Sequence, residues 1–151
     1  MSSVMLVLAI AGGVAGLQAA IWIPFIMIWS KKRAEFDARF ERERAESGEK
    51  ILRGPEKGVY NGSTQHYGSV KGNGRMWLTD KRIVFCKMTG GVVEIPLANV
   101  RGTREAKVFL RSISAGYMHF IVDTADRAEV GFYVSDNAAW ARDLASIAKS
   151  G

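Results

Sequence analysis

The sequence contains little cysteine, histidine or proline, and its N-terminal part carries no charged side chain. Its 151 residues include one cysteine, two histidines and three prolines, and no charged side chain precedes Lys31. A single cysteine excludes an internal disulfide, and so few cysteines and histidines argue against a metal site built from them. We therefore expect neither a metal nor a cofactor. The remaining composition, 48% hydrophobic and 24% charged, is typical of a globular protein and excludes wholesale disorder.

The charge-free N-terminal stretch predicts a transmembrane helix within residues 1–30. Val4–Trp29 is apolar apart from its glycines, Gln18 and Pro24. As a helix, this run is longer than the hydrocarbon core of a bilayer, which is roughly 30 Å thick. A cleaved signal peptide is the alternative, but it requires a positive segment before the apolar run. An uncleaved anchor in the lipid bilayer therefore fits the sequence better.

The cations that follow this run predict its orientation. Lys31, Lys32 and Arg33 come directly after it, and positive residues beside a span favour the cytoplasmic side. The sequence thus predicts a single-pass membrane protein whose C-terminal domain is cytoplasmic. The same three cations are candidate contacts for anionic lipid headgroups. The unpaired Cys86 agrees with a reducing compartment.

Small residues recur at one spacing within the apolar run. Gly12, Gly16 and Ala20 are each four positions apart and fall on one helix face. Such a face lets two membrane helices approach closely and predicts a helix–helix contact, for example in a homodimer. The alternative is that membrane helices are simply rich in glycine and alanine.

Residues 31–47 read as a charged helical connector. Glu35 and Arg39 are four residues apart, a spacing that supports a solvated helix. Phe36 and Phe40 form a narrow apolar stripe with the same spacing. This stripe fits either a helix lying on anionic lipid or pairing with a copy of itself, or a stalk whose two rings rest on the following domain. The low net charge favours the stalk.

From residue 48 to residue 151 the pattern changes to short β-like runs separated by glycine-containing turns. Several runs are apolar at every position, which indicates a curved sheet or barrel rather than a flat solvated sheet. A final helix is indicated by Trp140, Leu144 and Ile147 at helical spacing, with Ser135 or Asp136 as its cap. About seven strands followed by one capping helix is the pleckstrin-homology (PH) architecture.

One segment resembles a known family. Gly74–Phe85 contains a glycine, an apolar strand, the turn Leu-Thr-Asp-Lys-Arg and a second apolar strand. This pattern is similar to the signature of GRAM domains and bacterial PH-like domains, and Val93–Val100 resembles the next element of that family. The resemblance covers about residues 49–149. It implies a PH-like barrel that acts as a binding module, and it invites a phosphoinositide ligand. However, the first two strands offer only Lys57, Lys71 and Arg75 where lipid-binding PH domains carry a dense basic motif.

Two candidate binding regions follow within this domain. Arg101, Arg104, Lys107 and Arg111 form a concentrated basic group that fits contact with anionic lipid. Alternatively, these charges protect a strand edge from aggregation. The groove between the final helix and the sheet, at Trp140 and Leu144, is a candidate site for a protein partner.

Catalysis is not predicted. Cys86 lies in an apolar strand, and neither His66 nor His119 has a motif that supplies a nucleophile and an acid. A nucleic-acid partner is not expected either. The net charge is +6, but the sequence has no motif in which aromatic residues for base stacking alternate with basic residues. The sequence therefore predicts a non-enzymatic, membrane-anchored binding or scaffolding module. The alternatives are a structural protein that self-associates through its N-terminal helices, and a reader of anionic lipid or phosphoinositide.

Overall fold

The fold is described from a computed structural model of the chain. It describes residues 23–24, 27–28, 30–32, 34–39, 41–113 and 115–150. The chain divides into two compact units, Met1–Glu43 and Arg44–Gly151. The domain boundaries predicted after residues 30 and 47 remain predictions.

The described residues of the first unit are helical and correct the prediction of a transmembrane helix. Within the part of the chain that the structure describes, no helix is both long and apolar enough to cross a membrane. The physical reason is composition, because the described helical residues from Ser30 onward carry closely spaced charges of both signs. Most of Val4–Trp29 lies outside the described residues. The predictions of a single-pass membrane protein and of a cytoplasmic C-terminal domain depended on that helix and are wrong with it.

Other predictions for the N-terminal part concern residues outside the description. Gly12, Gly16 and Ala20 are among them, so their helix–helix contact stays untested. Phe40 also lies outside the described residues. Phe36 is described, and the centre of its ring lies 5.8 Å from the guanidinium carbon of Arg39.

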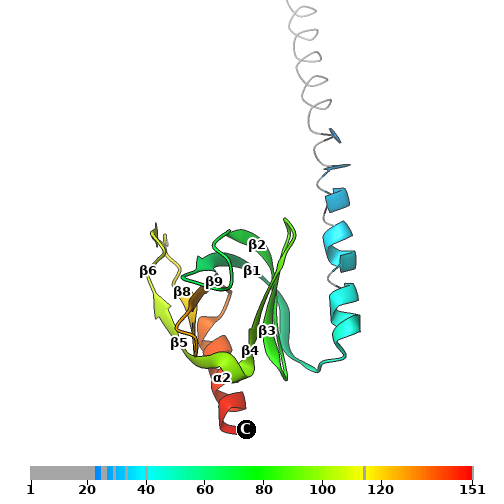
Figure 1. Cartoon of the computed structure of the whole chain (residues 1–151). Helices are drawn as coiled ribbons and strands as arrows, with labels where there is room; N and C mark the ends of the chain where they lie inside the picture. The colour runs from blue at the N-terminus through cyan, green and yellow to red at the C-terminus, as the bar shows by residue number, and fades with distance from the viewer. Residues whose placement is uncertain are drawn as a thin grey trace, which may run out of the picture. The chain divides into compact units, whose positions relative to one another are not determined.

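The second unit is built on one antiparallel sheet of seven strands in the order β4-β3-β2-β1-β9-β8-β5 (Figure 1). The strands are β1 (Ile51–Ser63), β2 (Gly72–Thr79), β3 (Arg82–Lys87), β4 (Val92–Pro96), β5 (Val100–Ala106), β8 (His119–Thr124) and β9 (Glu129–Tyr133). Between β5 and β8 the chain forms a separate hairpin of β6 (Val108–Phe109) and β7 (Ser112–Ile113). The helix α2 (Asn137–Ser150) ends the fold.

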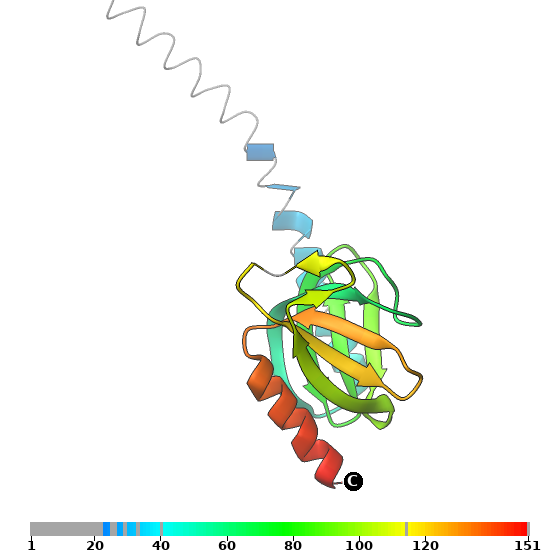
Figure 2. The same ribbon diagram turned by 90° about the vertical axis from the view of Figure 1, so that its left-hand side faces the viewer.

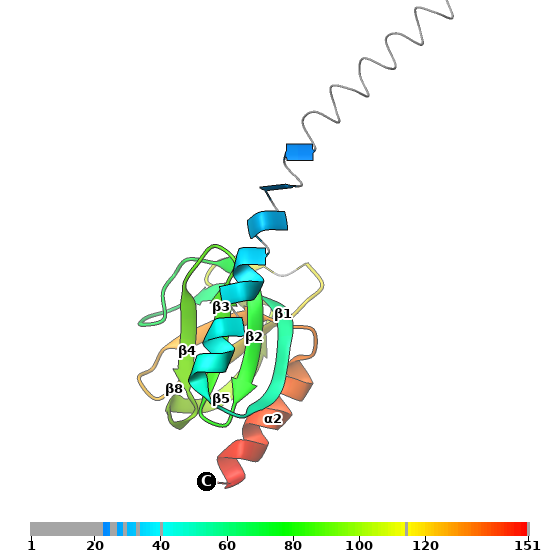
Figure 3. The ribbon, with the colours of Figure 1, turned by 90° about the vertical axis from the view of Figure 1, so that its right-hand side faces the viewer.

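The sheet is strongly curved. The strands β4 and β5 are joined by one 3-10 turn, Leu97–Asn99, yet they occupy the two opposite edges of the sheet. Figure 3 shows β1 to β4 side by side, and Figure 2 shows the other part of the sheet with α2 along one side. A mainly β fold of about seven main strands with a C-terminal helix is what the sequence predicted for this part of the chain.

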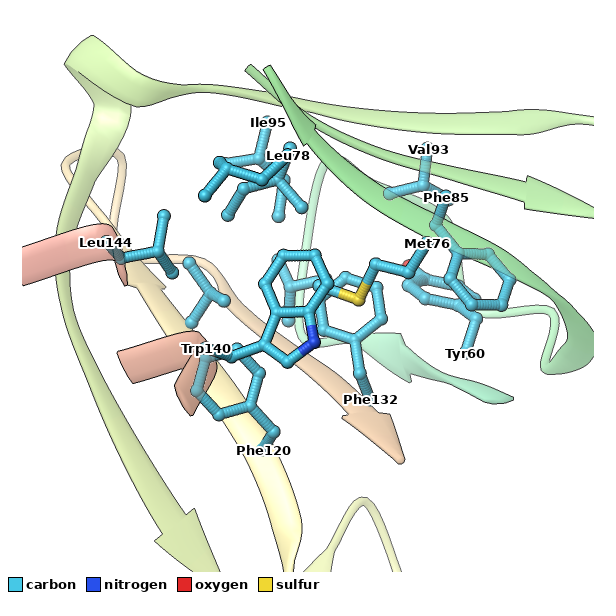
Figure 4. Packing of buried hydrophobic residues seen from close by; sticks show 13 residues of the cluster. Tyr60, Met76, Leu78, Phe85, Val93, Ile95, Phe120, Phe132, Trp140 and Leu144 are labelled. Carbon is cyan, nitrogen blue, oxygen red and sulfur yellow. The ribbon is translucent and has the colours of Figure 1, made fainter. Parts of the chain in front are cut away.

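The hydrophobic core lies inside the curve of the sheet, and α2 covers it. Trp140 of α2 is fully buried and points between Phe120, Phe132 and Met76, as Figure 4 shows. Its indole nitrogen donates a hydrogen bond to Glu56 of β1. Asp136 caps the helix, because its Oδ1 accepts a hydrogen bond of 2.9 Å from the backbone nitrogen of Ala139. These contacts fasten the helix to the sheet.

The turn between β2 and β3 shows the structural purpose of its motif. The hydroxyl of Thr79 accepts hydrogen bonds from the backbone nitrogens of Lys81 and Arg82, and it donates one of 2.8 Å to Glu49. The Arg82 Nε also donates to this carboxylate, at 3.0 Å. Burial acts to raise the pKa of Glu49, but the hydrogen bonds from Arg82 and Thr79 outweigh it and hold the pKa below its ordinary value. The carboxylate therefore stabilises the turn in its charged form.

Candidate binding surface on the β6–β7 hairpin

The β6–β7 hairpin is short and tightly closed. Val108 pairs with Ile113, and Phe109 pairs with Ser112. The two residues of the turn, Leu110 and Arg111, have φ angles of 45° and 62°. Left-handed conformations at both turn positions match the twist of a two-residue hairpin. Since side chains alternate along a strand, each pair faces one side of the ribbon.

The inner side of the ribbon packs against the seven-stranded sheet. Phe109 is buried, and its ring lies where a Cβ on Gly131 of β9 would be. Only glycine allows this approach without displacement of the ring. In Figure 2 the hairpin, in yellow, lies beside the orange strand β9. The hairpin is thus a cover for the outer face of β8 and β9.

A buried histidine connects the hairpin to three strands of the sheet. His119 is fully buried, and its Nδ1 lies 3.0 Å from the amide nitrogen of Asn61. An amide nitrogen only donates, so Nδ1 accepts and the proton of the neutral ring is assigned to Nε2. That nitrogen lies 3.1 Å from the carbonyl oxygen of Ser112 and 2.9 Å from the hydroxyl of Tyr133. The Tyr133 ring also stacks on the imidazole at a centroid distance of 4.4 Å. Both nitrogens therefore serve a structural network.

The loop between β1 and β2 lies against the same hairpin. The Lys71 ammonium donates a hydrogen bond to the hydroxyl of Ser112. A Cβ on Gly62 would lie 3.2 Å from both Leu110 Cδ1 and the carbonyl oxygen of Ser69, so the loop and the turn meet there. The side chain of Lys87 donates to the carbonyl of Val70 at 2.9 Å. These contacts combine the loop and the hairpin into one surface.

Tyr60 holds the base of this loop from the core. Its hydroxyl lies 2.6 Å from the carbonyl oxygen of Gly68 and 2.9 Å from that of Tyr67. Burial raises the pKa of Tyr60, so its hydroxyl remains a neutral donor at physiological pH. The Lys87 ammonium lies 4.5 Å from the centre of the ring, a distance typical of a cation–π contact.

The outer side of the ribbon is apolar and exposed. Val108 is 56% exposed and Ile113 is 79% exposed, although they form one cross-strand pair. Val70 and Tyr117, at 69% and 76%, are also exposed, in the loops that precede β2 and follow β7. We name this group, together with the partly exposed Leu110, the hairpin surface.

The surroundings of the hairpin surface are cationic. No acidic residue occurs between Glu56 and Asp80 or between Glu105 and Asp123, and these stretches contain the β1–β2 loop and the whole hairpin. Lys107 and Arg111 stand at the start and the turn of the hairpin. Among the residues that the structure describes, neither of them forms an ion pair.

The predicted basic group is only partly brought together. Arg104 is engaged by Asp123, at 3.5 Å, and by Glu129. Arg101 is exposed on β5, separated from Lys107 by an extended strand of roughly 20 Å. Lys107 and Arg111 are thus the two members of the predicted group that flank the hairpin surface.

The other predicted contacts lie elsewhere. Lys31 and Lys32 are exposed helical residues of the first unit, and Arg33 is outside the described residues. Trp140 and Leu144, the predicted partner groove, are part of the buried core. Sequence reasoning missed the exposed pair of Val108 and Ile113. The signal that was available is the long acid-free stretch around them.

Comparisons with known proteins give a likeness of fold. No family model matches the chain, and no curated protein matches it. Among solved structures, it is similar to the Vps36 N-terminal PH domain, with a TM-score of 0.44 and 20% identity over 68% of this chain and 84% of that chain. A likeness of this extent carries no argument about function. Membership of the GRAM or bacterial PH-like family stays a prediction.

Proposed function

We propose that this protein is a non-catalytic binding module that contacts its partner through the hairpin surface. The observation that carries the proposal is the exposed pair of Val108 and Ile113 on a ribbon whose other side is buried. Single exposed apolar residues are ordinary on protein surfaces, whereas a group of them marks a site of interaction.

The environment of the reactive side chains supports a binding function over a catalytic one. Cys86 is buried in β3, where a thiol acts as packing. His119 is fully buried, and both of its ring nitrogens lie within hydrogen-bond distance of structural partners. A general base must reach the proton that it removes. Neither side chain is placed to do so.

Site-directed photo-crosslinking tests the proposal. A photoreactive amino acid replaces Ile113 in the full chain, and a second protein carries it in place of Ala145, an exposed residue of α2. After irradiation in cells, adducts are examined both as shifted protein bands and as lipid-modified peptides. We expect adducts at position 113 and few at position 145.

Equal adducts at both positions, or none at position 113, would contradict the assignment of the binding surface. The crosslinker at position 113 points away from the buried side of the hairpin, so it does not disturb Phe109. Comparable circular dichroism spectra of the two proteins provide the control for folding.

A further inference from the structure

We infer that the partner of the hairpin surface is an anionic phospholipid bilayer surface, into which Val108 and Ile113 insert while Lys107 and Arg111 contact the headgroups. This inference rests on the proposed function and names its partner. Three features of the surface support it: its charge, the chemistry of its apolar side chains and its shape.

The charge of the surface is complementary to an anionic bilayer. Lys107 and Arg111 flank the apolar pair, and the sequence has no acidic residue from Ala106 to Val122. On β8 and β9, the carboxylates of Asp123 and Glu129 pair with Arg104, which offsets part of their charge. Each cation close to an anionic membrane strengthens association by roughly fivefold.

The apolar side chains favour lipid over a protein partner. Val70, Val108 and Ile113 are branched aliphatic residues without a polar atom, exposed by more than half. Energetic centres of protein interfaces are enriched in Trp, Tyr and Arg, and Leu and Val are under-represented there. Four of the five side chains of the hairpin surface are aliphatic, and Tyr117 is the exception. Aliphatic side chains beside cations are, in contrast, the composition of segments that lie in the membrane interface. Long cationic side chains reach the headgroups while the apolar groups enter below them.

The shape of the surface allows shallow insertion without unfolding. The exposed pair belongs to a ribbon whose buried side is held by Phe109 on Gly131 and by the hydrogen bond between His119 and the Ser112 carbonyl. All backbone groups of the short hairpin keep their places when its outer side chains leave water. The ordering cost is therefore small, because the site is already formed.

A fluorophore at the hairpin tests the inference in the full chain. The substitution Ile113→Cys introduces an exposed thiol for an environment-sensitive dye, since the native Cys86 is buried. A second labelled protein carries Ala145→Cys. Each is titrated with phosphatidylcholine vesicles, with and without phosphatidylglycerol, at low and high salt. The dye reports the surroundings of position 113 itself, so association through another part of the chain does not count as support.

We expect the dye at position 113 to become more emissive with anionic vesicles and the dye at position 145 to respond little. In the labelled protein, Lys107→Gln with Arg111→Asn should raise the lipid concentration at half response about twenty-five-fold at low salt. Val70→Thr with Val108→Thr keeps the branched shape and should raise it about tenfold. High salt should reduce the effect of the two cation substitutions and leave the effect of the two valine substitutions unchanged.

Matched variants control for general effects of charge and hydrophobicity. Lys81→Gln with Arg142→Gln removes two exposed cations elsewhere, and Leu52→Thr removes an exposed apolar side chain of β1. Both should leave the titration within about twofold of the unmodified labelled protein, because surface changes away from a site act weakly.

The outcomes separate the inference from the proposed function. An equal response of the dye to neutral vesicles would contradict the inference that the partner is an anionic bilayer. The same inference would be contradicted if Lys81→Gln with Arg142→Gln raised the lipid concentration at half response as much as Lys107→Gln with Arg111→Asn does. If the dye does not respond while a crosslinker at position 113 captures a protein, the binding module stands and its partner is a protein. If neither experiment gives a signal at position 113, both are wrong.

Discussion

Two hairpins of this protein differ in how far their outward side chains are buried. β2 and β3 pair over five positions from Gly74 to Leu78, within the large sheet. Their inward side chains Met76 and Phe85 enter the core, and their outward side chains Trp77 and Val84 are buried as well. The β6–β7 hairpin has two cross-strand pairs, of which one faces the sheet and the other faces solvent.

This difference shows why similar apolar patterns have different consequences. Apolar side chains in the β2–β3 hairpin stabilise the fold, since their removal from water is complete on both faces. The outer pair of the β6–β7 hairpin contributes little to folding, because it remains in water. Its apolar character therefore makes sense as a means of binding. Substitutions that act on one hairpin and spare the other can break or sharpen this comparison.

The largest effect is expected from Gly74→Ala in β2. A Cβ at this position would overlap with the carbonyl oxygen of Cys86 and lie 2.7 Å from the Phe85 ring. The neighbouring strand cannot yield without losing its pairing, so we expect a loss of about 3 kcal/mol in the free energy of unfolding. Chemical denaturation measures it. The control is Gly72→Ala in the same strand, where the nearest atom would be 3.7 Å away. A similar loss for both variants would contradict the explanation.

A smaller and local effect is expected from Gly131→Ala beneath the other hairpin. The new Cβ would overlap with the ring of Phe109, a side chain on a short ribbon that can move outward. We expect a loss of about 2 kcal/mol and faster hydrogen exchange in residues 108–113, with β2 and β3 unchanged. Gly102→Ala in β5, with no atom within 4 Å of its Cβ, serves as the control. Uniformly faster exchange throughout the sheet would show that the β6–β7 hairpin does not open independently of the sheet.

The smallest effect concerns the turn of the β2–β3 hairpin and depends on pH. The pKa of Glu49 is lower in the folded protein than its ordinary value of 4.5, so its contribution is complete above that value and is lost as the pH falls through the folded pKa. Glu49→Gln should lower the free energy of unfolding by about 1 kcal/mol at neutral pH. The difference from the unmodified protein should shrink in acid.

Denaturation at a series of pH values tests this expectation. Glu46→Gln provides the matched control, because it removes an exposed carboxylate from the preceding helical residues. Its effect should be small and nearly constant with pH. A difference for Glu49→Gln that grows as the pH falls would reverse the sign and refute the assigned role of this carboxylate.

The prediction from sequence succeeded where neighbours along the chain decide the structure. The turn motif after Leu78 gives the β2–β3 hairpin because Thr79 bonds the backbone only two and three residues ahead. The spacing of Trp140 and Leu144 predicted the final helix and its buried face. Both residues belong to the buried core, and the partner groove predicted at them stays a prediction.

The prediction from sequence was wrong where it inferred the surroundings of a segment, such as a membrane, from the residues of that segment alone. The apolar run from Val4 predicted a membrane span, but among the described residues no helix meets the length and apolarity required. The basic group on β5 and the hairpin likewise looked continuous in the sequence. In the structure Arg104 forms ion pairs with carboxylates of β8 and β9, strands that follow it in the chain.

The sequence by itself determined the β-rich character of residues 48–151, the tight turn at Thr79 and the closing helix, because these depend on side chains within a few positions of one another. Only the tertiary structure decided that Phe109 is buried and that its neighbour Val108 is exposed. That choice depends on Gly131 and His119, which strand pairing brings beneath the hairpin. Exposure is a property of the assembled sheet, and alternation along a strand states only that two neighbours face opposite sides.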